Sequence, residues 1–140
     1  MAKGGNFLLN IGPQPDGEMP AMALSRLKEL GDWMKINGEA IYSSRPIPPY
    51  KDGQIAFTSR GETAYAIYLT EEEQDVFPEK ISFSGLRPEP GSSIHILGAA
   101  DDLQWQTDDS GNTVVEIPES IVQSPPCNHA FALRFSLLKN

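Results

Sequence analysis

The chain has 140 residues, and its 11 basic and 19 acidic side chains give it a formal net charge of −8. A surface of that sign repels phosphate backbones and anionic lipid, which argues against a nucleic-acid-binding or membrane-surface protein. Twelve glycines and twelve prolines in so short a chain indicate many turns and favour short strands over long helices. Cys127 is the single cysteine, which excludes an intrachain disulfide and a cysteine-rich zinc site.

The first element expected in chain order is a buried strand over residues 7–11. Its sequence, FLLNI, is almost uninterruptedly apolar, which is typical of a strand in a parallel sheet that is covered on both faces. Two prolines and two glycines in residues 12–17 permit only a loop after it. Because the chain offers this strand no obvious neighbours, we expect it to be mobile or to pair with another chain.

A helix is expected next, beginning at Pro20 and ending at Asn37-Gly38. Its apolar residues recur at helical spacing, so we expect an amphipathic helix that packs on the domain that follows. These residues are Leu24, Leu27, Leu30 and Met34. Together with residues 7–11 the helix forms half of a β/α unit.

Three prolines fall within residues 43–53. Proline lacks a backbone N–H, so this segment can be neither a helix nor a central strand. We interpret it as a linker between a terminal β/α unit, residues 1–42, and a second domain, residues 54–140.

From residue 54 onward the apolar residues alternate with a period of two. Ile55 and Phe57 begin a strand, residues 59–62 turn the chain, and residues 64–69 complete a hairpin. Later alternations pair Ile81 with Phe83, Ile94 with Ile96, Leu103 with Trp105 and Val115 with Ile117, and the last runs from Phe131 to Leu137. About seven short strands at regular spacing predict a mainly β fold, an antiparallel β-sandwich preceded by one strand-loop-helix unit.

Five segments of the N-terminal part form a recognisable set: KGGNFLLNIGP at residues 3–13, Asp16-Gly17, Arg26-Leu27, GDW at residues 31–33 and NGEAIY at residues 37–42. Together they resemble the end of the catalytic domain in α-L-fucosidases of glycoside hydrolase family 29. In that family the run is the eighth strand of the catalytic (β/α)8-type barrel, its loop and the final helix. Further on, FTSRG at residues 57–61, AYAI at residues 64–67, Ile96-Leu97-Gly98, Leu103 and Trp105 resemble the C-terminal β-sandwich.

The resemblance implies that the parent protein is a retaining exo-glycosidase that removes terminal α-L-fucose from glycans. The family's nucleophilic Asp, its acid/base residue and the histidines that hold the sugar come from earlier barrel strands, so no catalytic residue is carried over to this chain. We therefore expect an inactive C-terminal fragment whose partners are the rest of the barrel and, through the parent, a fucosylated glycan. The resemblance implies no cofactor and a secreted, periplasmic or lysosomal parent. The alternative is a stand-alone, non-catalytic β-sandwich that binds carbohydrate or a protein partner.

Four residues are candidates for a minor role in sugar binding. If residues 7–17 are the last barrel strand and its loop, Asn10 and Asp16 lie near the active-site mouth, behind the residues that touch the sugar. Tyr50 and Tyr68 are the candidate surface aromatics, because an aromatic face suits the apolar face of a pyranose. The other aromatics of the second domain, such as Trp105, are expected to fill the core.

The remaining polar residues favour structural roles. We expect His95 and His129 to lie in strands as solvated or hydrogen-bonded side chains, and we expect no metal site. Residues 108–112 carry two aspartates but lack the distal Glu of a calcium loop, so they predict a hairpin turn. The acidic residues 71–75 and Asp101-Asp102 are likewise expected at turns. Cys127 is expected to be an unreactive loop or strand-edge thiol.

Overall fold

The structure is a computed structural model that describes residues 1–70 and 77–138. Its elements, in chain order, are α1 (Ala21–Asn37), the 3-10 helix η1 (Gly38–Ala40), β1 (Arg45–Asp52), β2 (Ile55–Arg60), β3 (Thr63–Leu69), β4 (Lys80–Phe83), β5 (Ile94–Ile96), β6 (Asp102–Leu103), β7 (Trp105–Thr107), β8 (Thr113–Glu116), α2 (Glu119–Gln123) and β9 (Ala130–Ser136). No helix among these described residues is long and apolar enough to cross a membrane.

The strands form two antiparallel sheets that face each other. The larger sheet has the order β1-β2-β3-β9-β5-β6, and the smaller has the order β4-β8-β7. Phe57 of the larger sheet meets Phe83 of the smaller edge to face, with ring centroids 5.7 Å apart, and Phe83 stacks on Phe135 at 5.6 Å. The predicted antiparallel β-sandwich is confirmed.

The expected hairpin is present, with Phe57 opposite Ala66 across β2 and β3. The prediction of a single strand around Leu103 and Trp105 is wrong, because the chain passes from one sheet to the other between these residues. Leu103 pairs with Ile94 in the larger sheet, whereas Trp105 pairs with Val115 in the smaller. Alternation alone does not reveal such a crossing, because both residues still point toward the shared core.

Residues 43–53 are not the linker that we expected, because β1 occupies most of this segment. β1 pairs with β2 through Arg45 and Pro46 at one end and Lys51 and Asp52 at the other, with a register shift between. It lies at the edge of the larger sheet, where proline's missing N–H faces no partner strand. The exclusion of a central strand therefore agrees with the structure, while the linker interpretation does not. The domain division itself stays a prediction.

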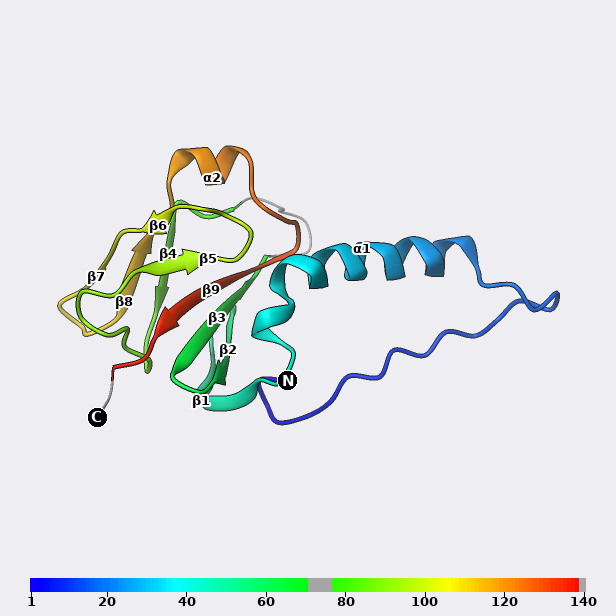
Figure 1. The fold of residues 1–140 in the computed structure, drawn as a ribbon, viewed down its shortest axis with the longest axis horizontal. Coiled ribbons are helices and arrows are strands. Elements are labelled where there is room, and N and C mark those ends of the chain that lie inside the picture. Colours follow the sequence, from blue (N-terminus) through cyan, green and yellow to red (C-terminus); the bar gives the residue numbers. More distant parts are fainter. Residues whose placement is uncertain (71–76, 139–140) are drawn as a thin grey trace.

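The strand expected over residues 7–11 is absent from the structure, and these residues follow an extended path away from the sheets (Figure 1). Phe7 and Leu8 are 74% and 91% exposed. α1 has the expected extent, with Pro20 as its N-cap rather than in its first turn. Only the C-terminal end of α1 reaches the sandwich, so our expectation that the whole helix packs on it is wrong for its first half (Figure 1). The acidic residues 71–75 lie outside the described residues.

The exposure of residues 7–11 leads to a prediction about amide exchange. The amides of Leu8 and Leu9 should exchange at nearly the rate of an unstructured peptide in a dilute monomer, because no strand protects them. Amides of the central strand β3, such as that of Ala66, should be strongly protected in the same sample. Strong protection of Leu8 and Leu9 would contradict this account of the segment.

Candidate functional site

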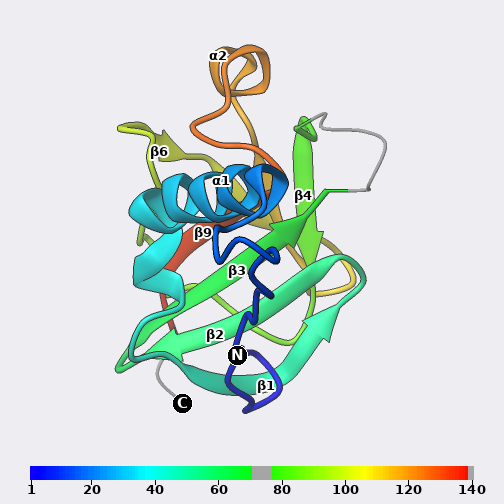
Figure 2. The same ribbon diagram turned by 90° about the vertical axis from the view of Figure 1, so that its right-hand side faces the viewer.

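The larger sheet has a second apolar face, turned away from the smaller sheet, which we call the outer face. It is formed by alternate residues of β2, β3 and β9, and η1 and the C-terminal end of α1 cover part of it (Figure 2). The buried residues of this cluster are Ala40, Tyr65, Ile67, Ala130 and Ala132. Because β3 and β9 are central and covered on both sides, their sequences are apolar at nearly every position.

Hydrogen bonds attach α1 and η1 to this face. The indole N–H of Trp33 donates to the Ala130 carbonyl oxygen at 2.8 Å, and the Thr58 hydroxyl donates to the Ala40 carbonyl oxygen at 2.7 Å. Asn37 is fully buried, and its Oδ1 accepts the backbone N–H of Ala132 at 3.3 Å. These bonds pair polar groups that would otherwise be buried without partners.

A polar cluster around Glu39 closes the edge of the covered region. The Tyr65 hydroxyl donates to Glu39 Oε1 at 2.8 Å, and Arg60 and Arg134 approach the same oxygen at 3.6 and 3.8 Å. Tyr65 itself is fully buried. Burial and the hydrogen bond to Glu39 raise the pKa of Tyr65 to about 12. The cluster therefore joins η1 to three strands of the sheet, β2, β3 and β9.

The raised pKa of Tyr65 predicts how the fold responds to alkali. Its ordinary value is 10.0, so the folded state holds the phenolic proton more tightly than the unfolded state does. The tighter binding of this proton stabilises the folded state. Its full contribution to the free energy of unfolding is present below pH 10 and is lost as the pH rises from 10 toward 12. An ultraviolet titration should show a phenolate step near pH 12 that Tyr65→Phe removes. A titration curve unchanged by the substitution would contradict this assignment.

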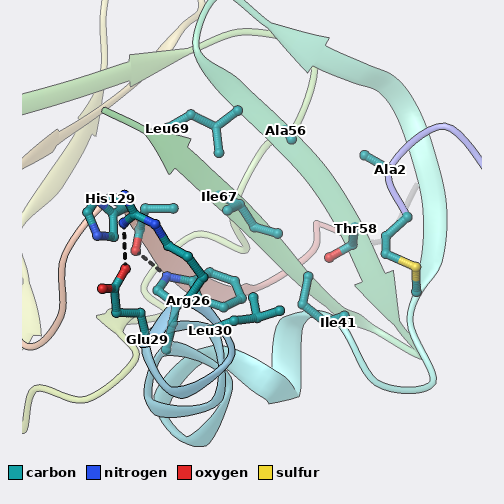
Figure 3. A pocket seen from close by; sticks show the side chains of 13 residues that line it. Ala2, Arg26, Glu29, Leu30, Ile41, Ala56, Thr58, Ile67, Leu69 and His129 are labelled. Atoms are coloured by element: carbon teal, nitrogen blue, oxygen red, sulfur yellow. Dashed lines mark hydrogen bonds and ion pairs between the residues drawn. The ribbon is translucent and has the colours of Figure 1, made fainter. Parts of the chain in front are cut away.

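Next to the covered region lies an open groove of about 570 Å³, which we call the outer-face groove (Figure 3). One wall is the sheet, and the other is α1 with the residue that follows η1. The residues that line it are Met1, Ala2, Arg26, Glu29, Leu30, Trp33, Ile41, Ala56, Thr58, Ile67, Leu69, His129 and Ala130. Most of this surface is aliphatic or aromatic.

The polar groups of the outer-face groove are engaged with one another and leave no acid/base pair. Arg26 and Glu29 form an ion pair at 2.8 Å, and its hydrogen bond holds the pKa of Glu29 below its usual value. Glu29 is the one carboxylate among the described lining residues. Retaining glycosidases need two carboxyl groups about 5–5.5 Å apart. The groove is therefore suited to receive an apolar surface.

The structure does not gather the four sugar-site candidates into one place. Asn10 is exposed in the extended N-terminal segment, and Asp16 Oδ1 accepts the backbone N–H of Glu18 at 3.0 Å within a local turn. Tyr50 is 44% exposed on the edge strand β1. Tyr68 is partly buried and packs against the sandwich core. No sugar-stacking platform follows from these positions.

The two histidines differ in their surroundings. His95 lies in β5, as expected, and its Nδ1 is 2.9 Å from Asp102 Oδ1. Ser93 donates its hydroxyl to the other Asp102 oxygen at 2.6 Å, so the carboxylate and not the imidazole stands between the other two groups. This is the wrong order for a Ser-His-Asp triad.

Two residues lie in other elements than we expected. His129 precedes β9 and is not in a strand, and Asp102 begins β6 rather than lying in a turn.

The remaining sequence expectations concern Cys127 and residues 108–112. The Cys127 thiol is hydrogen-bonded to the Ala130 carbonyl oxygen, and burial raises its pKa, which opposes reactivity. Asp108 accepts the backbone N–H groups of Ser110 and Asn112, closing the β7–β8 turn as expected. Among the described residues no group of three or more metal-binding side chains occurs.

The sequence did not reveal that Glu39 binds Tyr65, or that Asn37 is a buried hydrogen-bonding residue between α1 and β9. Both lie in the NGEAIY segment, which we treated as a helix stop and a family resemblance. The available signal was their polarity in an otherwise apolar stretch. Which groups they would bind depends on strands more than twenty residues away, so the sequence alone could not provide the partners.

The chain was compared with known proteins. The family model described as alpha-L-fucosidase matches residues 1–39. The tissue α-L-fucosidase of Homo sapiens is 32% identical over 139 residues, and the match covers 97% of this chain and 29% of that protein. The α-L-fucosidase of Branchiostoma floridae is 30% identical over 134 residues, with 94% and 29% covered. Among solved structures, Thermotoga maritima α-fucosidase in complex with a mechanism-based inhibitor aligns with a TM-score of 0.75 and 26% identity, covering 96% of this chain and 31% of that one.

The chain resembles the C-terminal portion of an α-L-fucosidase. It spans less than a third of the length of the curated α-L-fucosidases that it matches. The likeness runs through α1 and both sheets, because the structural alignment covers nearly the whole chain.

Proposed function

We propose that this chain is the non-catalytic C-terminal portion of a retaining exo-α-L-fucosidase, and that it supports the catalytic barrel. The barrel's remaining strands and helices are its partner, and the fucosylated glycan reaches it only through the parent enzyme. The observation that carries the proposal is a resemblance over nearly the entire chain to under a third of each relative.

The exposed apolar surface of the N-terminal part supports this proposal. Residues 7–11 have no strand beside them, and the first half of α1 presents large apolar side chains to solvent. The exposed fractions are 78% for Met22, 52% for Leu24, 36% for Leu27 and 40% for Leu30. Apolar surface of this extent, continuous with the outer-face groove, is typical of an interface and not of a free surface. A barrel that supplied strands beside residues 7–11 and helices beside α1 would cover it.

The described carboxylates support a scaffolding role. Glu29 and Glu39 are held by arginines, and Asp102 accepts from a histidine and a serine. Each of these three carboxylates therefore has a structural partner. Hydrolysis with retention would need two carboxyl groups free to act as nucleophile and as acid/base.

A hybrid enzyme tests the proposal. In it, this chain replaces the matching segment of Thermotoga maritima α-fucosidase. We expect the hybrid to unfold in one cooperative transition and to hydrolyse an aryl α-L-fucoside. A charge placed in the outer-face groove by Leu30→Lys should lower the Tm of the hybrid by several degrees, since Leu30 would face the barrel.

Leu138→Lys is the matched control, because Leu138 is 41% exposed, much like Leu30, but lies outside the groove. It should leave the Tm of the hybrid nearly unchanged. A hybrid whose two parts unfold independently, with equal effects of both substitutions, would refute the proposed interface.

A further inference from the structure

A second hollow, of about 540 Å³, lies away from the outer-face groove, where β1, the loop after β4, the β7–β8 turn and the chain after β9 come together. We call it the distal hollow. Its lining residues are Ile47, Pro48, Ser84, Gly85, Leu86, Arg87, Ser110, Gly111, Asn112, Leu137 and Leu138. One side is aliphatic, and the other carries hydroxyl and amide groups with a single charged side chain, Arg87.

Arg87 is the one cation that lines the distal hollow, and its guanidinium forms no ion pair or hydrogen bond with the described part of the chain. Its guanidinium lies beside the β7–β8 turn, where Nη2 is 3.1 Å from the position that a Cβ on Gly111 would occupy. A larger residue at that position would push the guanidinium away.

Two carboxylates of neighbouring loops, those of Asp52 and Asp108, are hydrogen-bonded to other groups and form no ion pair with Arg87. One oxygen of Asp52 accepts both the backbone N–H and the hydroxyl of Ser84, at 2.8 and 2.9 Å. Asp108 accepts two backbone N–H groups and the side-chain amide of Asn112, and these bonds lower its pKa. The positive charge of Arg87 therefore remains available to a ligand.

We propose that the distal hollow binds a carboxylate-bearing, N-acylated sugar of the glycan chain. A guanidinium pairs bidentately with a carboxylate. The hydroxyl of Ser110 and the amide of Asn112 suit the hydroxyl groups of the sugar, and the aliphatic side formed by Ile47 and Leu137 suits the methyl of the acyl group. The proposal rests on the proposed parent enzyme, whose substrate is a glycan, and it adds a direct contact between that glycan and this chain. Within that function it gives this part of the chain a preference for acidic glycans.

Calorimetric titration of the 140-residue chain tests the proposal. The ligand is the methyl glycoside of N-acetylneuraminic acid, and we expect saturable binding with a Kd of roughly millimolar order. The carboxamide derivative of the same glycoside should bind at least about tenfold more weakly, because it lacks the charge that pairs with Arg87. The substitution Arg87→Gln should weaken binding of the acid by a similar factor.

Arg45→Gln is the control variant, since Arg45 is also exposed but its guanidinium contacts only the Ser44 carbonyl oxygen. It should bind as the unaltered chain does. Equal binding of the acid and the carboxamide, or unchanged binding by Arg87→Gln, would overturn the proposal. Equally tight binding of N-acetyl-leucine would overturn the assignment to a sugar in favour of a peptide carboxylate. The fucoside assay of the hybrid enzyme is independent of all these outcomes.

Discussion

Replacing Gly98 with alanine should lower the free energy of unfolding by about 3 kcal/mol. Gly98 lies between β5 and β6 with a φ of +90°, which side chains rarely tolerate. A Cβ there would lie 2.7 Å from Ile36 Cγ2 and 2.9 Å from Pro126 Cβ. The substitution therefore adds steric overlap to backbone strain, and it forces the end of α1 away from the sandwich.

Gly91→Ala separates these two causes. Gly91 has a φ of +78°, but a Cβ there would meet no atom within 4 Å. Its replacement should cost only the backbone strain, about 1 kcal/mol. Urea unfolding of both variants gives the difference. Equal losses in the two variants would show that the close approach of α1 to the β5–β6 loop does not contribute to the cost of Gly98→Ala.

Asn37→Ala should lower the free energy of unfolding by about 2–3 kcal/mol. Asn37 is fully buried where α1 meets β9. Its Nδ2 donates to the Trp33 carbonyl oxygen and the Cys127 thiol, each at 3.3 Å, and its Oδ1 accepts the Ala132 N–H. The alanine variant loses all three bonds and leaves a small cavity between the helix and the sheet.

Asn128→Ala is the matched control, since Asn128 is an exposed asparagine close to Cys127 in sequence. It should change the free energy of unfolding by less than about 0.5 kcal/mol. Urea unfolding measures both variants. If the two substitutions had equal effects, Asn37 would not be a buried link between α1 and β9.

Much of the sandwich could be predicted from the sequence because its signals are local. The alternation of Ile55 and Phe57, the first turn and the turn at Asp108 each depend on residues close in the chain. The structure has all three, although the first turn is shorter than predicted because Ser59 and Arg60 still belong to β2. β1 was not predicted, because its three prolines cannot donate the backbone hydrogen bonds that hold a strand in a sheet. The crossing between Leu103 and Trp105 was missed because both residues point into one core.

The candidate site was less predictable because it is assembled from distant segments. The outer-face groove joins α1 to β2, β3 and the residues before β9, and no local pattern encodes that contact. The apolar helix positions were recognised, but their partner was not: Leu24 and Leu27 face solvent in this structure instead of packing on the sandwich. The distal hollow likewise brings Arg87 and Gly111 together only through the paired strands β4 and β8.

Turnover of an aryl α-L-fucoside by the purified 140-residue chain tests the central claim most directly. A scaffold that lacks the nucleophile and the acid/base residue of the catalytic barrel should release no aryl product above the buffer rate at any pH at which it is folded. Robust turnover, abolished by replacing one Asp or Glu of this chain with its amide, would contradict the account.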